Sequence, residues 1–190
     1  MVSEDCEGEP FSRRGLLRAA GAGAAGLLAA GCGRQSLKAL VHNSPPVLGT
    51  DVDLLNQLLH LEHWAIAAYT AGTPLLSPAV TQAAALFLND ELFHAGSLAG
   101  LVKEAGGKPI KPAPSYPLGH PRSSDDVLRL LHAIENAQLS AYLEALTRLE
   151  PGFVQASVAA ILANDAQHAS VVRAALHQPA VPAAFVTGRD

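Results

Sequence analysis

The sequence predicts an all-α fold, in which four long helices form two αα-hairpins joined by a long proline-rich crossover. Three observations support this prediction. Four segments repeat apolar residues at helical spacing, no segment alternates as a half-buried strand does, and the second pair of segments repeats the pattern of the first. A chain of 190 residues has room for one such domain rather than two.

Composition excludes several classes of protein. Hydrophobic residues make up 49% of the chain and charged residues 16%, which is too apolar for a disordered protein. The net charge of −4, without a run of Lys or Arg, argues against a nucleic-acid partner. Two cysteines cannot build a disulfide framework or a four-cysteine zinc site.

Residues 1–31 are typical of an export signal rather than of a fold. Arg13 and Arg14 form a pair that resembles a twin-arginine motif, and an apolar Ala/Gly/Leu stretch follows at 19–31. That stretch is shorter than the about 20 residues that a membrane-spanning helix needs. We therefore expect the twin-arginine export machinery as a partner.

The end of this signal resembles a bacterial lipobox, in which Cys32 becomes the first residue and carries a lipid. Ala29 stands where the motif usually has Leu, so cleavage without lipidation is one alternative. A cytosolic protein with an Ala-rich N-terminal helix is another. The main expectation is an exported protein of the cell envelope, periplasmic or on the extracytoplasmic face of a membrane. Residues 32–50 lack periodicity and are predicted to be a tether.

The first predicted hairpin consists of helices at 51–71 and 78–105, with Gly106-Gly107 ending the second. Proline is dense between 107 and 122, which favours an extended path that could reach roughly 45 Å. A helix of about 25 residues is only about 38 Å long. This segment can therefore return along the whole bundle.

The second predicted hairpin begins at Ser123, in a sequence that resembles a capping box. Its first helix is expected to end near Glu150, before a Pro-Gly pair, and its second to run over 153–178. The bundle thus covers 51–178, and 179–190 is a C-terminal tail.

The internal repeat carries polar residues at matched positions. Glu62 and Tyr69 in the first helix recur as Glu135 and Tyr142 in the third, with the same spacing of seven residues. The tyrosines lie two turns from each Glu on the same helix face, so their hydroxyls either bond the site or are satisfied within the core.

The second and fourth helices each carry a carboxylate three residues before a histidine. These pairs are Glu91 with His94 and Asp165 with His168. Residues three apart lie on one face of a helix, and all six polar side chains can converge in the middle of the bundle. They are Glu62, Glu91, His94, Glu135, Asp165 and His168.

Four carboxylates in a bundle interior repel one another and lose solvation. Two divalent cations would balance their charge, and the two imidazoles complete a nitrogen-and-oxygen ligand set that suits iron or manganese. The alternative is a solvated or vestigial polar set. His132, three residues before Glu135, could join the shell of the site, whereas His63 lies off the Glu62 face.

These motifs resemble the ferritin-like superfamily of di-iron and di-manganese carboxylate bundles, over about 51–178. The likeness is greatest to exported ferritin-like-domain proteins, which include desiccation-related proteins. The resemblance implies a ferritin-like bundle with two iron or manganese ions on the six residues, and Glu91 and Glu135 are candidates to bridge them. Asp165 stands where the family usually has Glu and is one methylene shorter, which leaves full occupancy open.

Three functions fit this interpretation. The first is a di-metal oxidoreductase acting on dioxygen or peroxide, of the ferroxidase, peroxidase or manganese-catalase type. The second is a stress- or desiccation-related surface protein that sequesters iron or manganese without turnover. The third is a metal-free structural lipoprotein. A homo-oligomer is compatible with each of them.

Overall fold

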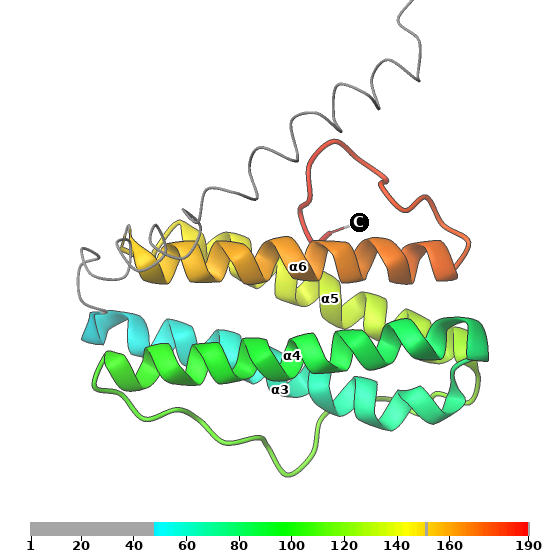
Figure 1. Ribbon diagram of the computed structural model, residues 1–190, viewed down its shortest axis with the longest axis horizontal. Helices are drawn as coiled ribbons and strands as arrows, with labels where there is room; N and C mark the ends of the chain where they lie inside the picture. The colour runs from blue at the N-terminus through cyan, green and yellow to red at the C-terminus, as the bar shows by residue number, and fades with distance from the viewer. Residues whose placement is uncertain (1–47, 151, 190) are drawn as a thin grey trace, which may run out of the picture. The chain divides into compact units, whose positions relative to one another are not determined.

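The computed structural model describes residues 48–150 and 152–189 (Figure 1). The predicted export pair Arg13–Arg14 and the predicted lipidation site Cys32 lie outside the described residues. Within the described part, no helix combines the length and the apolar character needed to cross a bilayer.

Four α-helices make up the described part of the chain, which contains no strand. They are α3 (Val52–Gly72), α4 (Pro78–Glu104), α5 (Ser124–Leu146) and α6 (Phe153–Ala175). Short 3-10 helices, η1 (Gly49–Asp51) and η2 (Thr73–Leu75), precede and follow α3. The predicted all-α class and the two helical hairpins are confirmed.

The proline-rich crossover joins the two hairpins and runs back along the bundle on the outer side of α3 and α4 (Figure 1). Asn56 of α3 holds its beginning, because its Nδ2 donates to the Lys108 carbonyl at 3.2 Å and its Oδ1 accepts from the Ile110 amide at 2.9 Å. Farther along, the Tyr116 ring lies 5.6 Å from the His60 ring. The crossover is therefore packed against α3 by specific contacts.

The start of α5 has the capping arrangement that its sequence predicts. The Ser123 hydroxyl accepts a hydrogen bond from the Asp126 amide at 3.2 Å, and Asp126 Oδ2 accepts one from the Arg122 amide at 3.1 Å. Two otherwise unpaired amides at the helix start are satisfied in this way.

Helices α5 and α6 end earlier than expected. After α5, the Thr147 hydroxyl donates to the Glu144 carbonyl and the Arg148 amide to the Ala145 carbonyl, which closes a tight turn before Glu150. After α6, His177 adopts a φ of 58° and turns the chain out of the helix. Hydrogen-bonding turns, rather than the prolines downstream, set both helix ends.

Two apolar clusters fill the bundle, and a polar layer separates them. On α3, Leu58 and Leu59 belong to one cluster, Ala65 and Ala68 belong to the other, and Glu62 lies between them. The carboxylates of the other three helices lie between the same two clusters. The fold therefore brings the polar residues of the repeat to one level of the bundle.

The ends of α4 and α6 share a left-handed residue, which allows a matched pair of substitutions to test its effect on stability. Gly106 (φ 76°) and His177 (φ 58°) occupy the same left-handed position after their helices. Only glycine adopts this conformation without steric cost, so His177→Gly should raise the free energy of unfolding and Gly106→Ala should lower it, each by about 1 kcal/mol. Urea unfolding of both variants measures this, and changes of the same sign would contradict it.

Candidate metal centre

Six side chains from the four helices meet in the polar layer. Four of them are carboxylates with no exposed surface, and the two imidazoles are at most 9% exposed. Their ligand-type atoms form two groups, each with all atoms within 4.8 Å of one another. The first group is Glu91, Glu135, Asp165 and His168, and the second is Glu62, His94 and Asp165. Asp165 belongs to both groups.

The smaller group surrounds the His94 ring. Nδ1 of His94 lies 3.3 Å from Asp165 Oδ1 and 3.5 Å from Glu62 Oε2, but neither contact has hydrogen-bond geometry. The three atoms thus face one another without being bonded. This is the arrangement expected of groups that share a further partner.

The larger group surrounds His168. Nδ1 of His168 lies 3.2 Å from Glu91 Oε1 and 3.6 Å from Glu135 Oε1. The other ring nitrogen, Nε2, lies 3.3 Å from a carboxylate oxygen of Asp90. A carboxylate on the far nitrogen fixes the orientation of an imidazole, so Asp90 holds Nδ1 toward the cluster.

Each tyrosine of the repeat bonds the glutamate of the opposite hairpin. The Tyr69 hydroxyl donates to Glu135 Oε1 at 2.5 Å, and the Tyr142 hydroxyl donates to Glu62 Oε1. Both tyrosines are also buried within the apolar clusters. The two interpretations left open by the sequence, core packing and bonding to the site, therefore both describe these residues.

Several buried oxygens of the cluster accept no hydrogen bond. They are Oε2 of Glu62, Oε2 of Glu135 and both carboxylate oxygens of Asp165. By contrast, Glu91 Oε2 accepts from Gln138 Nε2 at 2.9 Å. A buried acceptor without a donor lowers the stability of the fold. The protein provides no donor for these oxygens, so a partner from outside the chain must satisfy them.

Burial and mutual repulsion change the proton affinity of the cluster. Burial raises the pKa of Glu91 and that of Asp165 to about 7 each, and neighbouring carboxylates reinforce the shift. For His94 and His168, burial lowers the pKa, but the contacts with surrounding carboxylates outweigh it and bring each value to about 10. Without a cation, the cluster therefore retains protons in place of the missing positive charge.

The donor set of the cluster suits divalent metal ions. Iron and manganese bind mixed carboxylate and imidazole ligands, and the two groups offer both kinds, including carboxylate oxygens that have no hydrogen-bond donor. Two ions of charge +2 would match four carboxylates. The cluster is thus compatible with a metal site in its chemistry, its charge and its geometry.

Comparison with known proteins agrees with this geometry. A sequence profile for the ferritin-like domain matches residues 50–178. The chain belongs to the ferritin-like domain family. A search of curated proteins finds no match.

A solved structure shares the fold of this ferritin-like chain. It is the crystal structure of a conserved hypothetical protein, rv2844, from Mycobacterium tuberculosis, with a TM-score of 0.65 and 23% sequence identity. The alignment covers 71% of this chain and 96% of that chain. At this level of identity, the likeness concerns the fold alone.

The structure brings together all six residues of the predicted cluster. His132, the other candidate for the shell, lies beside Asn136 and Arg173, whose Nη1 is 3.3 Å from His132 Nε2. His63 borders a surface cleft against the crossover, which agrees with its place off the Glu62 face.

Sequence reasoning missed three neighbours of the cluster, namely Asp90, Gln138 and Phe87. Gln138 lies three residues after Glu135 on the same face, a spacing that could have identified it. The Phe87 ring stacks on the His168 ring at a centroid distance of 4.1 Å. Asp90 gave no such signal, because it lies next to Glu91 and its counterpart in the repeat is Asn164.

The crossed tyrosine bonds lead to a stability prediction. In the metal-free protein, Tyr69→Phe or Tyr142→Phe removes the donor to a buried carboxylate, which should cost about 1–3 kcal/mol in the free energy of unfolding. Tyr116→Phe is the control, because its hydroxyl bonds only the part-buried amide of Ala113. Thermal unfolding compares the three, and equal losses would contradict a special role for the two buried hydroxyls.

Proposed function

We propose that this chain holds two iron or manganese ions in the polar layer and uses them in redox chemistry with dioxygen, peroxide or Fe(II). The observation that carries the proposal is the position of Asp165, which belongs to both ligand groups and has two oxygens without a hydrogen-bond donor. A buried carboxylate that belongs to both ligand groups can bridge a pair of adjacent cations.

Asp165 is accordingly the proposed bridging residue. Glu91 is the second candidate, since it contacts His168 of its own group and interacts with Glu62 of the other group, which adds to the effect of burial in raising the pKa of Glu91. Glu135 also belongs to the larger group alone, and the Tyr69 hydroxyl already bonds its Oε1, which favours a terminal role for it. The short side chain of Asp165 suits its place because it lies within reach of both imidazoles, at 3.3 Å and 4.0 Å.

The protein orients the ligands before any ion binds. Each tyrosine hydroxyl holds Oε1 of a terminal glutamate and leaves its Oε2 without a partner. Asp90 holds the His168 ring from behind, and Gln138 holds one oxygen of Glu91. These bonds reduce the reorganisation needed for binding.

Bound iron or manganese would supply a change of oxidation state and Lewis acidity toward an oxidant. The chain contributes a low-dielectric surrounding, because apolar clusters close the polar layer on both sides. In the metal-free chain, burial raises the pKa of Glu91 and of Asp165 to about 7, so binding of the ions would displace protons from the cluster near neutral pH. Stoichiometric metal without turnover would instead support sequestration.

Ligand substitutions test the proposed assignment. Asp165→Ala should abolish retention of both ions, whereas His94→Ala should remove one ion and leave the His168 group occupied. His177→Ala, at an exposed position, is the control and should retain two. Elemental mass spectrometry after anaerobic loading and desalting counts the ions per chain. Retention of two ions by Asp165→Ala would refute its bridging role.

Asp90 should make the two metal positions unequal. Asp90→Asn, which copies the amide that the repeat places at Asn164, should weaken binding of one ion by about 10–100-fold. Asn164→Ala is the matched control on the other hairpin and should bind both ions as the unaltered chain does. Anaerobic calorimetry resolves the two binding steps, and an unchanged affinity in Asp90→Asn would count against the orienting role.

We also propose that the chain is exported by the twin-arginine route and anchored by a lipid on Cys32. Lysine in place of Arg13 and Arg14 should leave the full chain in the cytosol, and Cys32→Ala should leave it exported but free of the membrane fraction. Fractionation of producing cells with immunodetection measures both. Unchanged distribution of either variant would remove the corresponding part of the proposal.

A further inference from the structure

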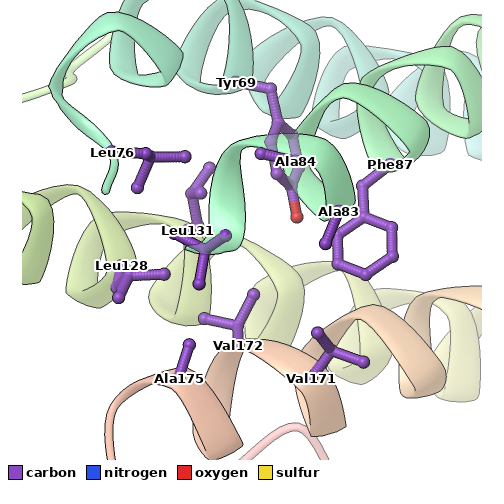
Figure 2. A pocket seen from close by; sticks show the side chains of 11 residues that line it. Tyr69, Leu76, Ala83, Ala84, Phe87, Leu128, Leu131, Val171, Val172 and Ala175 are labelled. Carbon is purple, nitrogen blue, oxygen red and sulfur yellow. The ribbon is translucent and has the colours of Figure 1, made fainter. Parts of the chain in front are cut away.

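An apolar cavity of about 20 Å³ lies among the helices of the bundle (Figure 2). Helices α3, α4, α5 and α6 all contribute to its wall, and every lining side chain is aliphatic or aromatic. Tyr69, Ala84 and Phe87 line one side, and Leu131 and Val172 line the other. The cavity has no part in the ligand set described above.

The inner wall of the cavity touches the cluster. Tyr69 carries the hydroxyl that donates to Glu135, and the Phe87 ring stacks on His168. The two aromatic rings meet edge to face, with centroids 6.3 Å apart. One thickness of side chain therefore separates the cavity from two of the proposed ligands.

The outer wall of the cavity reaches the surface. Val171 of α6 lines it and is 43% exposed, whereas Leu131 and Val172 behind it are at most 3% exposed. Alanine side chains from α4 and α6 face the same space, and their small size keeps it open (Figure 2). The cavity thus lies between solvent and the polar layer.

The size and the apolar lining of the cavity determine which small molecules can bind in it. A volume of this order holds about one or two water-sized molecules, but water needs two to four polar partners to occupy a buried site. The lining offers none, so water, peroxide and hydrated Fe(II) would lose hydrogen bonds there. Dioxygen is small and apolar and would lose none.

We propose that this cavity binds dioxygen and leads it from the surface between α4 and α6 to the His168 side of the metal centre. The binding step depends only on the cavity. Its delivery role rests on the proposed function, and it assigns dioxygen, rather than peroxide, as the oxidant.

Nuclear magnetic resonance under dioxygen pressure tests the binding step in the metal-free protein. Dissolved dioxygen is paramagnetic, so it speeds the relaxation of methyl groups that it contacts. Methyls of Leu131 and Val172 should relax faster than those of Leu55 and Val158, which are equally buried in the other apolar cluster. Equal enhancement in the two sets would overturn the proposal.

Substitutions that fill the cavity provide a second test of dioxygen binding. Ala84→Val places two added methyls in the space and should abolish the enhanced relaxation, and Ala175→Val does the same from α6 if the first variant folds poorly. Ala85→Val, on the exposed face of α4, is the control for the same chemical change. Enhancement that survives in both filled variants would contradict the assigned site.

The loaded protein separates this proposal from the proposed function. With two ions bound, the filled variants should show a several-fold higher KM for dioxygen at an unchanged metal count. An unchanged KM would refute the delivery role. A chain that retains no metal would refute the metal centre instead, and the relaxation measurement would still decide whether the cavity binds dioxygen.

Discussion

The burial of four carboxylates in one layer of an apolar bundle is the constraint on which the rest of this structure depends. Removing such groups from water costs several kcal/mol each unless opposite charge or hydrogen-bond donors replace the solvent. The protein supplies two imidazoles, two tyrosine hydroxyls and one amide, and Asp165 still has no donor. Protons or cations must provide the remaining compensation.

The internal repeat explains how one chain produces this layer. Each hairpin brings one glutamate and one carboxylate–histidine pair, and neither hairpin alone can enclose them. The tyrosine bonds cross from one hairpin to the other, from Tyr69 to Glu135 and from Tyr142 to Glu62. Docking of the hairpins and assembly of the cluster are therefore the same event. The crossover, which is hydrogen-bonded to Asn56, permits this docking because the crossover spans the length of the bundle.

The two halves of the centre are similar but unequal. Asp90 supports the His168 ring, and Gln138 supports Glu91, whereas Asn164 and Ala65 stand at the corresponding positions of the other hairpin. The cavity lined by Phe87 also adjoins the His168 side. All three differences fall on one of the two proposed ion positions. The two positions are therefore chemically different, although the sequence repeat alone would make them equivalent.

The sequence alone was sufficient to predict the helices, the hairpins and the six clustered side chains. Helical periodicity and the internal repeat can both be recognised from the spacing of residues along the chain. It did not separate core packing from site bonding for Tyr69 and Tyr142, since both roles place the ring on the same helix face. The sharing of Asp165 between the two groups depends on distances across helices and could not be read from spacing. The early end of α6 depends on the backbone conformation of His177, an unusual residue for a left-handed position.

The central claim is that the polar layer is a two-metal centre, and the most direct test is the number of ions that the unaltered protein retains. Metal-free protein would be titrated with Fe(II) or Mn(II) without oxygen, desalted, and analysed by elemental mass spectrometry. The account predicts two tightly held ions per chain. A chain that retains none would contradict it and would mean that protons alone stabilise the buried carboxylates.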